Sequence, residues 1–371
     1  MSNVIRVAHL TSVHQRYDTR IFLKQCVSLA KDKKYFVTLI VADGKGDEII
    51  KNVQIIDVGK AKSRLSRFIS SNKKVFLKAL NLKCDIYHLH DPELIPFGLK
   101  LKHKNKKVIF DSHEDVSEDI MIKDWIPIFL RKIISKMYEV FEKKACSKFD
   151  LVITPTSFIQ KKFSQKGILA KSIKNFPINN EFKFQDIEWN QKKNEVCYIG
   201  AISEERGIIE IVKSLDLLGD VKLNLGGSFS DNKLREKCIN LKGWSKVNEM
   251  GFLDRRQINE VFLRSKAGLA VFHPTSTYLP SLPVKIFEYM AAGIPIICSN
   301  FELWDNMILK KYKCGLKINP LNPHDIAKAI SAIINEKNMA EKMIIEGKKG
   351  IMNDFNWDNE ENKLYNIYNN I

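Results

Sequence analysis

The 371-residue chain is long enough for two domains of roughly 100–200 residues, and its 44% hydrophobic and 28% charged residues exclude a disordered protein. No stretch approaches the roughly 18 uncharged apolar residues of a membrane-spanning helix. The net charge of +17 lies almost entirely in residues 1–180, which hold 34 basic and 18 acidic side chains, so we expect a polyanionic partner: nucleic acid, anionic lipid or a phosphorylated substrate. A codon bias that favours lysine would raise the number of lysines in both halves alike, so it does not explain this asymmetry.

The first half alternates apolar strand-like runs with helix-like segments. This alternation is typical of βα units around a parallel sheet that has helices on both faces. The strands expected here are Val4–Leu10, Phe36–Val41, Val53–Val58, Ile86–Leu89, Val108–Phe110 and Leu151–Ile153.

The alternation breaks at Pro177 and a mixed charged stretch, and then restarts. The strands expected in the second half are Val196–Ile199, Lys222–Leu225, Ala267–Val271 and Ile294–Cys298. The predicted division is a first domain at 1–176, a linker at 177–194, a second domain at 195–355 and an amphipathic C-terminal helix at 356–371 that crosses back to the first domain.

The cysteines and the first residues of the chain bear on its compartment. Seven scattered cysteines with no Cys-x-x-Cys pair argue against a disulfide framework or a zinc ribbon and favour a reducing cytosol. Met1–Val7 lacks the basic and apolar segments of a signal peptide, so we expect a cytoplasmic protein.

The segment 281–295 predicts a helix with defined ends. Pro283 suits its first turn, Ser281 is a candidate N-cap, and Gly293 with Pro295 ends it. The first amides of such a helix are free, and the macrodipole adds partial positive charge there. This is an anion site suited to a diphosphate.

Two charged side chains extend that anion site. Lys285 adds a full positive charge beside the amides near Val284, and Glu288 lies one turn further along the same face, where it can bind ribose hydroxyls. An ordinary capped helix with a solvated lysine–glutamate pair is the alternative interpretation.

Strands that end in glycine add to the site. Gly200 permits close backbone approach after the first of them, and Arg206 in the next loop can fork onto phosphate oxygens. A second strand ends at Gly226-Gly227, and Met250–Leu253 is a third junction, suited to reading a nucleobase.

In combination these motifs resemble the retaining glycosyltransferases of family four, over nearly the whole chain. The resemblance is strongest in Leu282–Pro295, then in Gly200–Gly207, Gly251–Leu253 and Ala8–His14. Asp18–Phe22 resembles a bacterial surface-polysaccharide subgroup of O-antigen and capsule assembly. The resemblance implies the α/β fold GT-B: two Rossmann-like doubly wound domains facing each other across a cleft, the first binding the acceptor and the second the nucleotide-sugar.

The resemblance also implies roles for residues of the second half. Arg206 matches the basic diphosphate ligand, the backbone near Val284 and Lys285 matches the diphosphate cradle, and Glu288 matches the second, ribose-binding glutamate of the E-x7-E motif. Phe252 lies at the base-reading turn.

Two positions depart from the family pattern. The first glutamate of E-x7-E, which touches the donor sugar, would fall at Pro280. Ala201 stands where an arginine often follows Gly200, and Lys285 is our candidate to replace that charge.

Two strand ends of the first half, Asp85–Asp91 and Phe110–Asp115, are rich in His and Asp. They lack ordered ligand spacing, so we expect no metal; packing and loop hydrogen bonds explain His88 and His90. The resemblance places His113 beside the donor sugar, with a structural histidine as the alternative.

Candidate acceptor residues lie in the loop Thr11–Arg20, whose family counterpart is near the diphosphate and acceptor. His14 is one of them, Asp18 is a candidate to orient the acceptor hydroxyl, and Arg20 is a candidate ligand of acceptor phosphate. Helix capping explains Asp18 equally well.

A basic amphipathic segment, Lys60–Lys83, has eight basic and no acidic residues and can lie on an anionic bilayer, each cation adding about 1 kcal/mol. The region Trp125–Tyr138, with Arg131, Lys132 and Lys136, can extend this patch. A helix packed on the sheet with a solvated lysine face is the alternative.

The implied activity is the transfer of a sugar, with retention and without metal or other cofactor, from a nucleotide-sugar, expected to be UDP-linked, to a polyprenyl-diphosphate-linked saccharide. The basic first domain would hold the enzyme on the inner face of the plasma membrane. Arg206, Lys285 and His113 are the catalytic candidates. The alternatives are a nucleotide-sugar epimerase of the same fold, a non-catalytic scaffold, and a nucleic-acid-binding protein, which no motif supports.

Overall fold

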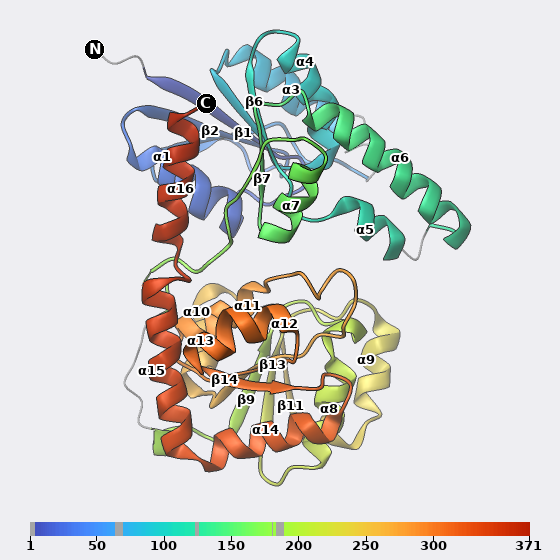
Figure 1. Ribbon diagram of the computed structural model, residues 1–371, viewed down its shortest axis with the longest axis vertical. Coiled ribbons are helices and arrows are strands. Elements are labelled where there is room, and N and C mark those ends of the chain that lie inside the picture. The colour runs from blue at the N-terminus through green and yellow to red at the C-terminus, as the bar shows by residue number, and fades with distance from the viewer. Residues whose placement is uncertain (1–3, 64–69, 123–125, 180, 183–188) are drawn as a thin grey trace. The chain divides into compact units, whose positions relative to one another are not determined.

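The computed structural model describes residues 4–63, 70–122, 126–179, 181–182 and 189–371, and its contacts divide the chain into two compact units. The first unit comprises Met1–Asn175 with Trp357–Ile371, and the second comprises Phe176–Asn356 (Figure 1). Each unit is built on its own sheet. Within the described residues, no helix has the length and apolar character needed to cross a bilayer.

The sheet of the first unit has the strand order β3-β4-β2-β1-β5-β6-β7-β8. All neighbours pair in parallel except β3 and β4, which are antiparallel. Burial on both faces explains why the inner strands read as continuous apolar runs. The strands are β1 (Ile5–Leu10), β2 (Tyr35–Val41), β3 (Glu48–Ile50), β4 (Val53–Asp57), β5 (Ile86–Leu89), β6 (Lys107–Asp111), β7 (Leu151–Thr154) and β8 (Ala170–Ser172).

The helices of the first unit include the last helix of the chain, α16. Its Trp357 indole donates a hydrogen bond to the Ser28 hydroxyl at 2.9 Å, and its Tyr365 hydroxyl donates to the Ser28 carbonyl at 2.6 Å. A π-helical segment, Thr19–Cys26, leads into α1. The α-helices are α1 (Val27–Lys31), α3 (Asn72–Asn81), α4 (Ile95–Lys102), α5 (Val116–Ile122), α6 (Ile128–Cys146), α7 (Ser157–Gln165) and α16 (Trp357–Asn369).

The sheet of the second unit is parallel throughout, in the order β11-β10-β9-β12-β13-β14. The order runs outward in both directions from β9 and β12, so the switch point lies between these two strands, where open α/β sheets bind their ligands. The strands are β9 (Glu195–Ile199), β10 (Lys222–Gly226), β11 (Val247–Gly251), β12 (Ala267–Ala270), β13 (Ile296–Ser299) and β14 (Gly315–Ile318).

The helices of the second unit flank this sheet (Figure 1). A short 3₁₀ turn, Glu204–Arg206, precedes the first of them. The α-helices are α8 (Ile208–Asp216), α9 (Asn232–Ile239), α10 (Arg255–Arg264), α11 (Val284–Ala291), α12 (Glu302–Trp304), α13 (Lys310–Tyr312), α14 (Pro323–Asn335) and α15 (Lys337–Asn353).

In the described part of the basic segment Lys60–Lys83, the helix packs on the sheet, which was the alternative interpretation of this segment. Residues 64–69 lie outside the described residues, and α3 covers much of the remainder. Val75 and Phe76 of α3 are buried, and the helix packs against β1 and β2. The expectation that this helix lays its apolar face on a bilayer is therefore wrong for Val75 and Phe76.

Candidate functional site

Beside the switch point of the second unit, the carboxyl ends of β9 and β10 lie so close together that a side chain would not fit between them. Gly200 has φ +129° and its amide donates to the Gly226 carbonyl at 2.9 Å. Gly227 has φ +140°, and a Cβ there would lie 1.9 Å from the Gly200 carbonyl oxygen. Both conformations are rare for residues other than glycine, so these glycines allow the ends of β9 and β10 to lie in close contact.

The loop after β9 holds Arg206 against an aromatic surface. Its guanidinium lies 5.7 Å from the Phe272 ring centroid, and its Nε donates to the Tyr278 hydroxyl at 3.2 Å. Gly207, with φ +67°, ends the short turn before α8. Arg206 thus has an aromatic and hydroxyl setting and no carboxylate partner among the described residues.

Lys285 reaches the same place from the first turn of α11. Its Nζ lies 3.4 Å from the Tyr198 ring centroid and 5.4 Å from that of Phe272. A Cβ added to Gly200 would lie 3.5 Å from this Nζ, so the ammonium sits over the end of β9. It is buried and has no hydrogen-bond partner among the described residues. Burial, together with the neighbouring Arg206 charge, holds the pKa of Lys285 well below its usual range.

The N-terminus of α11 opens beside these two cations. The helix begins at Val284 with Pro283 at the N-cap, and within the described residues no side-chain cap is found at its first amides. Ser281 was the expected cap, and that prediction is wrong because its hydroxyl donates to the Tyr278 carbonyl at 2.9 Å. The predicted end of the helix is confirmed at Gly293, which has φ +69°. Two cations and uncapped helix amides make a site for a multiply charged anion.

Glu288 is held by a residue that the sequence did not single out. Arg255 donates from Nη1 to Glu288 Oε1 at 2.6 Å and lies 2.8 Å from Glu181 through Nη2. This carboxylate is almost wholly buried and belongs to the second turn of α11. Arg255 is the first residue of α10, whose N-cap is Asp254.

Phe252 projects from the turn between β11 and α10. Its side chain is 84% exposed, whereas its neighbour Leu253 is buried in the core. An exposed aromatic ring beyond a strand end is a surface on which a flat ring can stack. The structure therefore leaves this candidate open to a ligand.

In the first unit, Asp111 is the centre of the candidate cluster. Arg20 donates two hydrogen bonds to this buried carboxylate, from Nε at 2.9 Å and from Nη2 at 2.7 Å, and the Gln25 amide donates a third at 2.7 Å. The charge of Arg20 offsets burial and keeps the pKa of Asp111 well below its usual range. Arg20 itself is buried and also donates to the Ile173 carbonyl. The expected role of Arg20 as a ligand of acceptor phosphate does not fit this internal ion pair.

A row of histidines extends from Asp111 into the sheet. His113 Nε2 lies 3.3 Å from the Asp111 carboxylate and 3.3 Å from His90 Nδ1, and His90 Nε2 lies 2.9 Å from His9 Nδ1. Burial lowers the pKa of His9 well below its ordinary value and lowers that of His90 to about 3. These two rings are therefore neutral at physiological pH.

The row ends at the C-terminal helix. The Tyr368 hydroxyl lies 2.7 Å from His88 Nδ1 and 3.3 Å from His9 Nε2. Burial also holds the pKa of His88 well below its usual range. The packing interpretation of His88 and His90 agrees with these contacts, and α16 closes the row from outside.

His14 and Asp18 lie at the accessible end of the cluster. The His14 ring centroid is 4.7 Å from that of His113, and His14 Nδ1 is 3.6 Å from Asp18. Burial lowers the pKa of His14, but the Asp18 hydrogen bond and nearby carboxylates raise it overall. Asp18 also accepts from the amides of Arg20 and Ile21, so it caps the helical segment that follows, which was its alternative interpretation.

Among the described residues, two groups have ligand atoms close enough together to bind a metal ion: His9 with His88 and His90, and His90 with Asp111 and His113. In the first, His9 and His90 share a hydrogen bond, and in the second Asp111 already accepts from Arg20. We therefore interpret both groups as parts of one hydrogen-bonded network.

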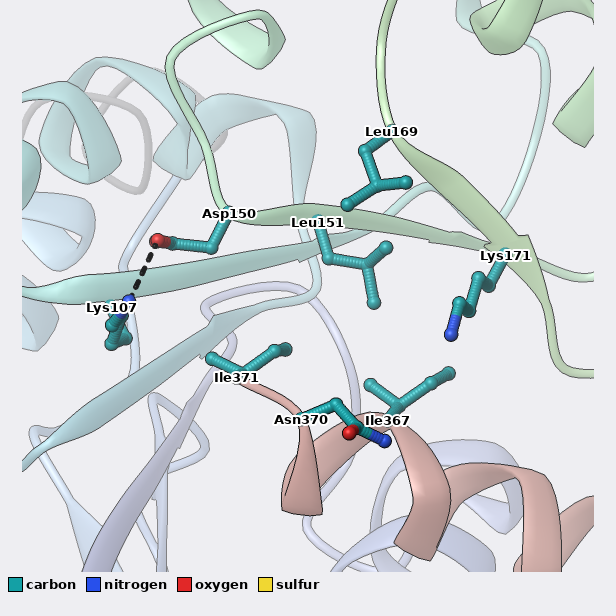
Figure 2. A pocket seen from close by; sticks show the side chains of 8 residues that line it. All are labelled: Lys107, Asp150, Leu151, Leu169, Lys171, Ile367, Asn370 and Ile371. Atoms are coloured by element: carbon teal, nitrogen blue, oxygen red, sulfur yellow. Dashed lines mark ion pairs between the residues drawn. The ribbon is translucent and has the colours of Figure 1, made fainter.

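A cavity of about 200 Å³ in the first unit lies away from these residues (Figure 2). Lys107, the first residue of β6, and Asp150, just before β7, line it as an ion pair with 3.6 Å between the charged atoms. These are amino ends of strands, whereas ligands of open α/β sheets bind at the carboxyl ends. The cavity is not the candidate site.

The comparisons with known proteins agree with this geometry. Residues 179–350 match the family described as "Glycosyl transferases group 1". The match lies within the second unit and includes the whole anion site.

Two curated relatives are named as glycosyltransferases. "Uncharacterized glycosyltransferase MJ1607" of Methanocaldococcus jannaschii is 22% identical over 77% of this chain and 75% of its own length. "Uncharacterized glycosyltransferase MJ1069" of the same organism is 24% identical over 72% of this chain and 69% of its own length.

Solved structures establish the fold. Sucrose-phosphate synthase from Thermosynechococcus elongatus matches with a TM-score of 0.75 at 16% identity, covering 99% of this chain and 98% of that one. Anabaena Alr3699/HepE, solved in complex with UDP-glucose, matches with a TM-score of 0.75 at 14% identity, covering 99% and 100%. The predicted fold class, two Rossmann-like doubly wound domains of the GT-B type, is confirmed.

Proposed function

We propose that this protein is a retaining glycosyltransferase that moves a sugar from a UDP-sugar to an acceptor hydroxyl without a metal ion. The observation that carries the proposal is the buried ammonium of Lys285, which has no acceptor among the described residues and lies beside Arg206 and the uncapped start of α11. A nucleoside diphosphate has the negative charge that these groups would bind. The Anabaena protein solved with UDP and UDP-glucose supports the choice of donor.

These groups act on the leaving group. As the bond to the sugar breaks, negative charge grows on the diphosphate, and Arg206, Lys285 and the first amides of α11 stabilise it in a setting of low dielectric. The acceptor hydroxyl attacks from the same side as the leaving group, and a diphosphate oxygen takes its proton. Glu288 binds the ribose and Phe252 stacks on the base.

The first unit takes the acceptor and positions the sugar. His113 is the candidate beside the donor sugar, held by the Asp111 carboxylate at 3.3 Å. The basic residues of this half favour an acceptor linked to a polyprenyl diphosphate, on the cytoplasmic face of the plasma membrane in O-antigen or capsule assembly.

Two alternatives are separated by experiment. A nucleotide-sugar epimerase would convert the donor with no acceptor present. A non-catalytic scaffold is favoured by Pro280, which stands where the family has a sugar-binding glutamate.

The test is a thermal-shift series with UDP-, GDP- and ADP-glucose, followed by incubation of the stabilising donor with and without lipid-linked saccharide. Binding raises stability by RT ln(1 + [L]/Kd), so a UDP-sugar at 100 Kd should add about 2.7 kcal/mol. Transfer only when acceptor is present supports the proposal. Conversion of donor alone supports the epimerase, and binding of the donor without conversion in either incubation supports the scaffold. No shift with any nucleotide-sugar refutes the proposed donor site.

A further inference from the structure

The outer face of α6 is apolar where a surface helix is normally polar. Phe129, Ile133 and Met137 follow at four-residue spacing, so they lie on one stripe along the helix. They are 72%, 56% and 68% exposed. Further apolar side chains on this helix that are exposed by at least a third are Ile128, Ile134, Val140 and Phe141.

The other face of α6 is fixed to the first unit. Ala145 and Cys146 are buried, and Ser135 donates to the Ser117 carbonyl of α5 at 2.8 Å. Figure 1 shows α6 running beside α5 at the edge of this unit. The exposed stripe is thus held outward by contacts on the opposite side of the helix.

Positive charges border the stripe. Lys132, Lys143 and Lys144 are exposed and have no ion-pair partner within the part of the chain that the structure describes. Lys136 pairs with Glu139 on the same helix at 2.8 Å. If two copies of this helix met face to face, these like charges would be brought together, which opposes self-association.

We propose that α6 lies in the surface of an anionic phospholipid bilayer, with Phe129, Ile133 and Met137 among the acyl chains and the lysines at the headgroups. An anionic bilayer supplies both partners that this face lacks, an apolar layer and negative charge. His113 lies in the loop between β6 and α5, and α5 is the helix that precedes α6 in the chain. The inference rests on the proposed function in so far as this surface brings the enzyme to a lipid-linked acceptor.

The test is sedimentation of the full chain with vesicles of phosphatidylcholine, with and without 30% phosphatidylglycerol. We expect the mixed vesicles to bind at least tenfold more tightly than neutral ones. The triple variant F129D/I133D/M137D should lose at least tenfold of that binding.

A second triple variant controls for charge. Ile49, Leu169 and Met352 lie outside α6 and are 77%, 64% and 76% exposed, so I49D/L169D/M352D adds the same three charges. It should keep wild-type vesicle binding within twofold. Circular dichroism and UDP-glucose binding, measured on every variant, separate loss of folding or of the donor site from loss of lipid binding.

Three results would overturn the proposal. Equal binding to neutral and anionic vesicles would refute the role of the positive charges. Retained binding by the α6 variant would refute the role of this helix in lipid binding. If the wild-type protein is a dimer, the α6 variant is a monomer and neither binds vesicles, this face is an interface with a second copy of the chain.

Discussion

The Lys285 ammonium lies 3.4 Å from the centroid of the Tyr198 ring, and Tyr198 is itself fixed by a hydrogen bond from its hydroxyl to the Ala201 carbonyl at 2.8 Å. The ring face attracts the cation but does not replace the water that burial removes. An anion at this place would supply the missing partner. Stability and ligand binding should therefore respond in opposite directions to the removal of this charge.

Lys285→Met tests that opposition. Methionine keeps most of the side-chain volume and removes the buried charge, so we expect the ligand-free protein to gain about 1–3 kcal/mol in free energy of unfolding. The dissociation constant for UDP-glucose should rise at least tenfold, about 1.4 kcal/mol. Urea denaturation and calorimetry measure the two effects.

The matched control is Lys213→Met, in the exposed part of α8. It should change neither quantity by more than about 0.5 kcal/mol. Unchanged donor binding in Lys285→Met would remove Lys285 from the diphosphate site.

Gly227→Ala should be severely destabilising. The new Cβ would lie 1.9 Å from the Gly200 carbonyl oxygen, at a residue whose φ of +140° already disfavours a side chain. We expect a loss of about 3 kcal/mol or more in thermal unfolding, from steric overlap added to backbone strain. Gly219→Ala is the comparison, because no atom lies within 4 Å of its Cβ and its φ is not positive. Equal stability of the two variants would contradict this packing of the strand ends.

The four edge strands are β3, β8, β11 and β14, and of these the sequence predicted only the end of β11, at the junction Met250–Leu253. An edge strand is covered on fewer sides, so its residues alternate or are mixed in polarity. Of these strands, β11 has no fully buried residue and β14 has one. Most of the ten inner strands have the apolar runs on which the prediction depended, although Lys222 and Asn224 interrupt the run in β10. Hydrophobic pattern therefore predicts the middle of a doubly wound sheet better than its borders.

The residues of the candidate site also differ in how far the local sequence could predict them. Arg206, Lys285 and Glu288 were predictable because they follow strand ends or open a helix at fixed spacing in one segment. Arg255 was not, since its partners Glu181 and Glu288 are distant in sequence and nothing local marks the pair. The ion pair of Arg20 with Asp111 joins residues 91 positions apart for the same reason.

Arg20→Met separates two roles for Arg20. If its function is to hold Asp111, the variant leaves a buried carboxylate without its cation and should lose about 3–5 kcal/mol of stability. Adding Asp111→Asn should restore part of that loss, because the uncompensated charge is removed. A ligand of acceptor phosphate would behave differently: stability would stay within about 0.5 kcal/mol of wild type, and the acceptor KM would rise. Urea denaturation of the single and double variants decides between them.

The buried histidines should make the protein sensitive to mild acid. His9, His88 and His90 have lowered pKa values in the folded chain because they are buried, whereas in the unfolded chain they titrate near 6.5. Between about pH 6.5 and the folded values, the unfolded state therefore binds more protons, and stability falls as pH falls. His14, with a raised pKa, opposes this in part.

The three neutral histidines, less the opposing share of His14, should therefore make the free energy of unfolding lower at pH 5.5 than at pH 7.5, by on the order of a few kcal/mol. Urea denaturation at the two pH values measures it. His88→Gln removes one of the three groups and should reduce the difference between the two pH values, even if the variant is less stable at both. His324→Gln, an exposed position in α14, should leave the difference unchanged. If wild-type stability were equal at the two pH values, the row of histidines would not be buried and neutral as its contacts indicate.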